Sequence, residues 1–179
     1  MDAFEIIKDR RSVKKYTDKP VPRELVEKVC RAGTWAATGM GRQSPIILAV
    51  TNKEVRDKLS EINAEVMGAK NDPFYGAPVV LVVLANKAMP TAIYDGSLVM
   101  GNMMIEAESL GLGSCWIHRA KEEFETEYGK RLLKELGIEG EYEGIGNLIL
   151  GYGDGEKPPP GCSSGGFSLW NDIIKIQKI

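Results

Sequence analysis

The sequence predicts a mixed α and β domain, with about four or five strands and helices on both faces of the sheet. Three observations support this prediction. The segment VVLVVLA (79–85) is β-branched and apolar on both faces, as expected of a central strand. IILAV (46–50) and IGNLILGYG (145–153) have the composition of two further buried strands. Helical periods lie between these strands, so the elements alternate along the chain.

The first half of the chain begins with a short helix over residues 3–9, which has a phenylalanine and two isoleucines on its apolar side. After two prolines, a helical period is predicted over residues 23–37. Residues 38–45, TGMGRQSP, have the composition of a loop. The strand 46–50 follows, and Asn52 is placed to cap the next helix.

The second half continues the alternation. Its predicted elements are a glycine- and proline-rich connection (67–78), the strand 79–85, a small-residue-rich helix (95–110), the strand 113–117, an amphipathic helix (121–136) and the strand 145–153. No repeat or domain boundary is evident, so residues 1–179 are predicted to form one domain with an extended C-terminal arm over 155–179. Because the proline-rich arm has little to pack on within its own domain, we expect it to dock on a partner subunit.

Composition excludes several classes of function. The chain has 179 residues and a net charge of −2, which argues against a nucleic-acid partner, because such proteins need a basic face. The longest apolar run, residues 77–85, is too short to span a bilayer. Asp2 and Glu5 interrupt any signal pattern. We therefore expect a cytoplasmic protein without a membrane partner.

Metal and thiol chemistry are not expected either. The three cysteines are widely spaced and His118 is the sole histidine, so neither a zinc site nor a disulfide framework is predicted. A proton-donor role for His118 is the less favoured interpretation, since most single histidines serve packing or the surface. Cys115 is interpreted as a small buried residue.

The segment RRSVKKY (10–16) concentrates positive charge in a nearly neutral chain. Arg10, Ser12 and Lys14 alternate, so in an extended chain their side chains would share one face. A hydroxyl and cationic groups on one face could bind a phosphate. A solvated surface explains the same charge run, and the residues alone leave both interpretations open.

Five segments, in order, resemble the nitroreductase family of FMN-dependent flavoproteins. They are RRSVKKY (10–16), AATGMGRQSP (36–45), YGAPVVLVVLA (75–85), DGSLVMGNMMIEAESLGLGSCWI (95–117) and IGNLILGYGDGEKPPP (145–160). The resemblance covers nearly the whole chain. It implies an α+β, nitroreductase-like three-layer fold with a mixed central sheet. It also implies a homodimer whose two flavin sites lie at the interface, with the small-residue-rich helix and the wrapping arm contributing to it.

The resemblance also implies roles for individual residues. Arg10, Arg11 and Ser12 would hold the FMN phosphate and ribityl chain, and Lys14 would lie near N1 and O2 of the flavin ring. Gln43 would bond the flavin across the dimer. The remaining implied residues are Gly113, Ser114 and Trp116 near flavin N5, and Phe74, Tyr75 and Gly41 in the substrate pocket.

Two departures from the family pattern affect this site. Gly41 stands where the family loop often has asparagine. Many members also carry a lysine or arginine after the late proline-rich turn. This chain has Cys162, Ser163 and Ser164 there, and Lys157 precedes the prolines. Either FMN binds less tightly than is usual for the family, or Arg11 supplies the missing charge.

The implied activity is that of an FMN-dependent oxidoreductase. Reducing equivalents would pass from NADH or NADPH through flavin N5 to an electron-poor small molecule such as a nitroaromatic or quinone, in a ping-pong order. No side chain is assigned as catalytic, because flavin N5 does the chemistry. The alternatives are a flavin carrier or redox sensor without efficient turnover, and an interaction scaffold that keeps only the fold.

Overall fold

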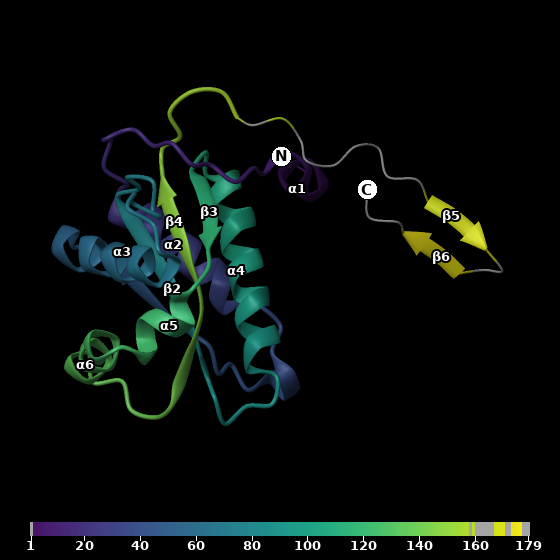
Figure 1. Cartoon of the computed structure of the whole chain (residues 1–179). Helices are drawn as coiled ribbons and strands as arrows, with labels where there is room; N and C mark the ends of the chain where they lie inside the picture. Colours follow the sequence, from purple (N-terminus) through teal and green to yellow (C-terminus); the bar gives the residue numbers. More distant parts are fainter. Residues whose placement is uncertain (1, 158, 160–166, 171–172, 177–179) are drawn as a thin grey trace.

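The structure is a computed structural model that describes residues 2–157, 159, 167–170 and 173–176 (Figure 1). The elements in this part of the chain are, in order, α1 (Ala3–Asp9), α2 (Arg23–Thr34), the 3-10 helix η1 (Gly39–Gly41), β1 (Ile46–Val50), α3 (Lys53–Met67), β2 (Val79–Asn86), α4 (Ala92–Ser109), β3 (Gly113–Ile117), α5 (Ala120–Glu125), α6 (Glu127–Glu135), β4 (Tyr142–Gly151), β5 (Phe167–Trp170) and β6 (Ile173–Ile176).

Strands β1 to β4 form one sheet in the order β1-β2-β4-β3. All three strand pairs are antiparallel, and the β2–β4 register shifts at a bulge between Val83 and Leu84. The prediction of a mixed sheet is therefore corrected for these strands. A parallel pairing is present in the described residues as the isolated bridge between Ser12 and Ser114. The number of strands in this sheet agrees with the expected four or five.

Helices cover both faces of the sheet, which confirms the three-layer arrangement (Figure 1). Successive side chains of β2 alternate between two cores because neighbouring strand residues point to opposite faces. Leu81 and Val83 pack in the core shared with α2 and α4, whereas Val80 and Val82 pack in the core shared with α3 and α5. Both faces of β2 are buried, which explains its uninterrupted apolar sequence.

Helix α4 uses its small residues mainly against its own sheet. A Cβ on Gly96 would lie 2.5 Å from Ile145 Cγ1, so glycine permits close packing on β4. Ala107 is buried in the same core. A Cβ on Gly101, by contrast, would meet nothing within 4 Å. Gly96 and Ala107 therefore serve packing within the chain, and a contribution of this helix to a homodimer remains a prediction.

The predicted helix over 121–136 is two helices, α5 and α6, separated at Thr126. The Thr126 hydroxyl accepts a hydrogen bond from the Gly129 N–H at 3.1 Å and so caps the start of α6. Gly129 packs on the end of α5, where a Cβ would lie 2.4 Å from the Glu123 carbonyl oxygen. The tight turn between the two helices explains the break.

The segment after α1 is extended and crosses one end of the sheet. The Val13 N–H donates to Ser114 O at 3.0 Å, and the Thr17 N–H donates to Tyr152 O at 2.9 Å. The Asp154 N–H in turn donates to Lys15 O at 2.9 Å. Residues 12–17 are therefore fixed between the start of β3 and the end of β4.

The C-terminal arm contains a two-stranded antiparallel pair, β5 and β6. Figure 1 shows this hairpin (yellow) lying away from the four-stranded sheet. Most of the predicted linker, including Cys162, Ser163 and Ser164, lies outside the described residues. None of the helices in the described part of the chain combines the length and apolar character needed to cross a bilayer.

Candidate functional site

A pocket of about 450 Å³ lies beside the extended N-terminal segment. Its walls are residues 12–15, residues 111–113 at the start of β3, and residues 153–157 after β4. Three lysines contribute to this lining: Lys14, Lys15 and Lys157. The pocket therefore joins the cationic N-terminal motif to two glycine-rich turns.

Val13 holds the motif against the sheet. A Cβ on Gly113 would lie 2.9 Å from Val13 Cβ, so this close approach requires glycine at position 113. The neighbours of Val13, Ser12 and Lys14, are both exposed and both line the pocket. Ser12 and Lys14 thus put a hydroxyl and an ammonium group along one wall, but Arg10, which the alternation predicts to share their face, does not line the pocket.

The two arginines of the motif lie outside this lining. Arg11 Nη1 donates to the backbone oxygens of Lys8 at 2.6 Å and Arg10 at 2.9 Å. A cation at these carbonyls stabilises the C-terminal end of helix α1. The Arg10 N–H continues the helical bonding to Ile6 O at 3.0 Å. The structure thus gives Arg11 a contact at the helix end, and the phosphate role of both arginines remains a prediction.

Lys157 lines the pocket that contains Ser12 and Lys14. The family pattern predicts a basic residue after the prolines, and Lys157 precedes them, so the sequence does not indicate Lys157 as a site residue. The chain after β4 runs back beside the N-terminal segment, where Lys15 and Asp154 form a salt bridge of 2.6 Å. Lys157 forms a second salt bridge with Glu108, near the end of α4. The apposition of the two segments brings Lys157 to the pocket, and no local sequence signal indicates it.

Cys115 and Tyr16 lie behind the motif. Burial raises the pKa of the Cys115 thiol, and the hydrogen bond with Ser12 and the charges of Lys14 and Arg10 only partly oppose this shift. Burial likewise raises the pKa of Tyr16, whose hydroxyl donates to Val13 O at 2.7 Å. Both groups stay protonated near neutral pH, in agreement with the interpretation of Cys115 as a small buried residue.

The structure separates the two aromatic residues predicted for the substrate pocket. The Tyr75 side chain is exposed, and its ring centroid lies 5.7 Å from Lys14 Nζ. The Phe74 ring is fully buried in the core beneath α3, with the Arg56 guanidinium 5.5 Å from its centroid. Neither of the two is among the residues that line the pocket: Phe74 is buried in the core, and Tyr75 lies beside Lys14.

The β3 residues predicted to lie near flavin N5 differ in whether they line the pocket. Gly113 lines the pocket, but Ser114 is buried and its carbonyl oxygen accepts the Val13 N–H. The Trp116 ring packs against the core shared with α2 and α4, where a Cβ on Gly146 would lie 2.3 Å from its Nε1. The tight fit between the indole and Gly146 directs Trp116 into the core and away from the pocket.

Gly41 and Gln43 lie near the opposite end of α4. The Gly39 N–H donates to Asp95 Oδ1 at 2.9 Å, which fixes this loop at the first turn of the helix. Glu108, the partner of Lys157, is in the last turn. The 18 residues of α4 span about 27 Å at 1.5 Å per residue. Within one chain, the loop of Gln43 and the pocket of Lys14 therefore do not meet.

One face of α4 leaves apolar side chains exposed. Tyr94 is 72% exposed and Leu98, one turn later, is 50% exposed. Trp35, directly after α2, and Met40, in η1, are exposed to 82% and 81%. Large exposed apolar patches of this kind mark interaction surfaces in soluble proteins.

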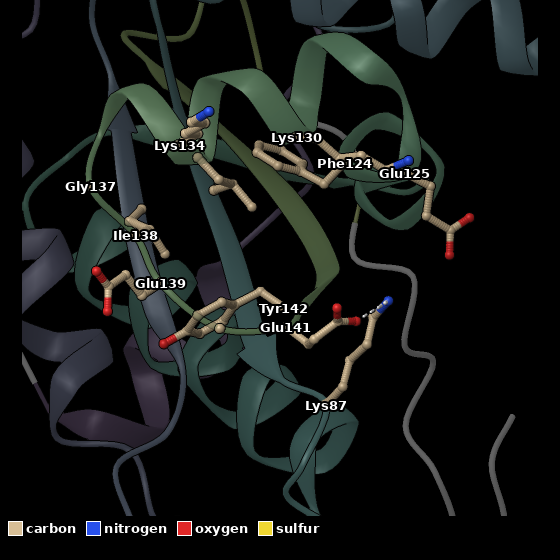
Figure 2. Close-up of a pocket in the computed structure, with 12 residues that line it drawn as sticks. Lys87, Phe124, Glu125, Lys130, Lys134, Gly137, Ile138, Glu139, Glu141 and Tyr142 are labelled. Carbon is tan, nitrogen blue, oxygen red and sulfur yellow. Dashed lines mark ion pairs between the residues drawn. The ribbon is translucent and has the colours of Figure 1, made fainter.

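A second pocket, of about 410 Å³, lies between α6 and the loop that leads into β4 (Figure 2). Its charged lining is mixed, since three lysines and three glutamates contribute: Lys87, Lys130, Lys134, Glu125, Glu139 and Glu141. Lys87 and Glu141 are 4.0 Å apart. None of the predicted site residues lines this pocket, which leaves the pocket of Ser12 and Lys14 as the candidate site.

Comparison with known proteins identifies the family. A profile of the nitroreductase family matches residues 7–73 and 66–152. This chain belongs to the nitroreductase family. The nitroreductase with bound FMN from Bacteroides fragilis has the same fold, with a TM-score of 0.82 at 24% identity over 96% of this chain and 100% of that one. An FMN-dependent nitroreductase from Clostridium difficile gives a TM-score of 0.72 at 28% identity, covering 86% of this chain and 89% of its own.

Two curated relatives extend this comparison. A Methanothermobacter thermautotrophicus protein with the name "Putative NADH dehydrogenase/NAD(P)H nitroreductase" is 31% identical over 120 residues, which are 65% of this chain and 60% of the relative. The FMN reductase [NAD(P)H] of Bacillus subtilis is 27% identical over 136 residues, or 62% of this chain. This nitroreductase-family chain spans about 60% and 52% of the length of these two relatives.

Proposed function

We propose that this chain is an FMN-dependent NAD(P)H oxidoreductase, built as one domain over residues 1–179. The observation that carries the proposal is the convergence of Ser12, Lys14 and Lys157 on one pocket of about 450 Å³. The names of the relatives, an NAD(P)H nitroreductase and an FMN reductase, support the same activity. So does the presence of FMN in the B. fragilis structure of the same fold.

The pocket suits a phosphorylated flavin. A phosphate needs positive charge and hydrogen-bond donors, which Ser12 and Lys157 would supply. Two glycines of the pocket wall, Gly111 and Gly155, have left-handed backbones with φ of 72° and 97°, and a Cβ on either would point into open space. The glycines thus leave room for the ligand and allow backbone conformations that other residues rarely adopt.

Lys14 would serve the ring end of the flavin. When bound, FMN would supply two-electron redox chemistry between NADH or NADPH and an electron-poor acceptor such as a nitroaromatic or quinone, in a ping-pong order. A fixed ammonium near N1 and O2 favours the negative charge that reduction leaves there. Gly113 and the Tyr75 side chain would orient first NAD(P)H and then the acceptor on the flavin ring. No side chain needs to act as a general acid.

We further propose a homodimer that completes the site. Gln43 and Gly41 lie about 27 Å along α4 from the pocket of their own chain. A second copy packed antiparallel along α4 would bring its Gln43 loop to this pocket. The exposed Tyr94 and Leu98 side chains and the open space at Gly101 support α4 as the contact. The arm over 155–179 would then wrap the partner.

One observation favours the alternative function. Lys157 is paired with Glu108, so part of the positive charge that a phosphate would need is neutralised. A weakly held flavin fits a carrier or redox sensor without efficient turnover. The two functions differ in whether an acceptor accelerates NAD(P)H oxidation.

The test is a visible spectrum of the purified protein with FMN, titrated without oxygen with NADH and then with NADPH. An oxidoreductase should lose its flavin absorbance near 450 nm with at least one donor, and a quinone should restore it within one turnover. Bound FMN that neither donor reduces would instead support the carrier. A protein that binds no added FMN would contradict both functions.

A further inference from the structure

The backbone of Tyr75 is strained. Its φ is +52°, in the left-handed region that bulky side chains rarely occupy. Gly76, which follows, has a φ of +73° that glycine adopts readily. A residue such as Tyr75 keeps this conformation only where the surrounding structure holds it, and such residues cluster at ligand sites. The turn before β2 therefore needs a holding structure.

Asp72 holds this turn from one side. Its carboxylate accepts the N–H groups of Phe74 at 2.8 Å and Gly76 at 2.7 Å. Its backbone oxygen accepts the Tyr75 N–H at 3.1 Å. Asp72 thus accepts hydrogen bonds from three consecutive N–H groups: that of the strained residue Tyr75 and those of its two neighbours.

Helix α3 anchors Asp72 in turn. Arg56 Nη2 lies 2.5 Å from Asp72 Oδ2, and the Ser60 hydroxyl donates to Asp72 Oδ1. Arg56 Nε also donates to Ala77 O at 3.1 Å, so it bonds both ends of the turn. The Arg56 side chain is buried, which makes these bonds costly to break. We call Arg56, Ser60 and Asp72 the α3 clasp.

The negative charge of Asp72 is maintained near neutral pH. Burial acts to raise the pKa of Asp72, but the hydrogen bonds from Ser60, Arg56 and the N–H groups of Gly76 and Phe74 outweigh it. The pKa of Asp72 consequently lies below its ordinary value. An ionised Asp72 keeps all four oxygen lone-pair sites available as acceptors.

The clasp determines where the Tyr75 ring lies. The ring centroid is 5.7 Å from Lys14 Nζ, within the range of a cation–π contact, and the side chain remains partly exposed. Lys14 belongs to the N-terminal segment and lines the candidate pocket. The turn held by α3 thus places an aromatic ring beside Lys14, which a different part of the chain contributes, although Tyr75 is not itself among the residues that line the pocket.

We infer that Arg56 and Asp72 are positioning residues, which hold Tyr75 beside Lys14 as a fixed wall that selects planar aromatic acceptors. This inference rests on the proposed function, because Lys14 is assigned there to the ring end of the flavin. Neither Arg56 nor Asp72 touches the acceptor. Their effect is transmitted through the backbone of residues 74–76.

The experiment compares acceptor kinetics of the FMN-loaded protein with 1,4-benzoquinone and the larger menadione. Asp72→Asn keeps the side-chain shape but removes the charge. We expect it to raise the KM for menadione about 5- to 10-fold, with kcat and the FMN affinity within about twofold of the native protein. Tyr75→Asn, which tolerates the left-handed backbone and lacks the ring, should give the same change. The double variant should be no worse than either single variant, because both act through one ring.

Two controls separate positioning from general stability. Tyr75→Phe keeps the ring and should leave the KM for menadione within about twofold of the native value. Thr126→Ala removes the cap of α6, far from the pocket, and should lower stability without changing either KM. A KM that rises equally in Thr126→Ala and Asp72→Asn would overturn the inference.

The outcomes also separate this inference from the proposed function. FMN-loaded Asp72→Asn with unchanged KM for both quinones would overturn the inference and leave the proposed function standing. A native protein that binds no FMN would overturn both. If Asp72→Asn does not fold, the KM for menadione of Tyr75→Asn is compared with that of Tyr75→Phe. Equal values for these two variants would overturn the inference.

Discussion

Lys157 forms a salt bridge with Glu108 at the pocket that also contains Ser12 and Lys14. The side chain of Glu108 is only 10% exposed, whereas that of Lys157 is 53% exposed. Under the proposed function, Glu108 would therefore compete with the FMN phosphate for Lys157.

We predict that the Lys157–Glu108 pair limits FMN affinity. Glu108→Gln should tighten FMN binding several-fold, because Lys157 is then available to the phosphate. Lys157→Met should weaken it about 10-fold and reduce the dependence of the affinity on salt. Fluorescence titration of FMN at two salt concentrations measures both effects. Equal dissociation constants for the two variants would show that the pair does not face the phosphate.

The close contact at Gly113 gives a second prediction. A Cβ at this position would lie 2.9 Å from Val13 Cβ, so Gly113→Ala should push residues 12–14 away from β3. FMN affinity should fall about 10-fold or more because Ser12 and Lys14 move together. Val13→Ala in the same chain removes the close contacts of Val13 Cγ1 and Cγ2 with the new methyl group but keeps that of Cβ, so it should recover only part of the loss. Unchanged affinity in Gly113→Ala would mean that the motif is not held by this contact.

The buried carboxyl of Glu123 makes stability depend on pH. Burial raises the pKa of Glu123 from 4.5 to about 8, although hydrogen bonds from Asn63 and Asn147 oppose the shift, and the charge of Glu122 adds to it. The Oδ1 atoms of Asn63 and Asn147 have no partner among the described residues.

The sign of this effect follows from proton linkage. The unfolded chain releases the Glu123 proton above pH 4.5, whereas the folded protein keeps it until about pH 8. The contribution of Glu123 to the free energy of unfolding is therefore most favourable below pH 4.5 and declines as the pH rises to about 8. We expect the decline to be on the order of a few kcal/mol.

Urea unfolding at pH 5 and at pH 8 measures this decline in the free energy of unfolding. Glu123→Gln keeps the size of the side chain and cannot titrate, so its stability should fall less between these pH values than that of the native protein. Glu122→Gln, the neighbouring exchange, is the control and should retain most of the native pH dependence. A native-like decline in Glu123→Gln would show that another group is responsible.

The exposed face of α4 is predicted to form the dimer contact. Leu98→Glu places a charge at a side chain that is 50% exposed in the single chain, and it should yield a monomer with weaker FMN binding. Leu136→Glu is a matched control, because Leu136 is 55% exposed on the other side of the sheet, after α6. Sedimentation analysis should show dimers for the native protein and Leu136→Glu. Dimers of Leu98→Glu would exclude this face.

Local sequence patterns predict the sheet and its layers well. The doubly apolar run 79–85 indicates a strand covered on both faces, and β2 is buried in this way. For this strand a period of two residues determines the face, so neighbouring residues carry the information. The alternation of Arg10, Ser12 and Lys14 predicts less, because Ser12 and Lys14 line the pocket together with Val13 and Lys15, whereas Arg10 does not.

Features that depend on distant contacts could not be predicted in the same way. The burial of Phe74 depends on Arg56 from α3, and the position of Lys157 depends on two segments that meet side by side. The break at Thr126 follows from the packing of Gly129 on Glu123. The pairing order of the strands, all antiparallel here, likewise depends on the whole fold.

FMN binding at the pocket of Ser12 and Lys14 is the central claim, and one titration tests it most directly. FMN fluorescence should be titrated with the native protein, with Ser12→Ala combined with Lys14→Met, and with Lys130→Met combined with Lys134→Met in the pocket of Figure 2. We predict that the first double variant loses at least about 10-fold in affinity, whereas the second binds as the native protein does. Native affinity in the first double variant, or a loss confined to the second, would contradict the account.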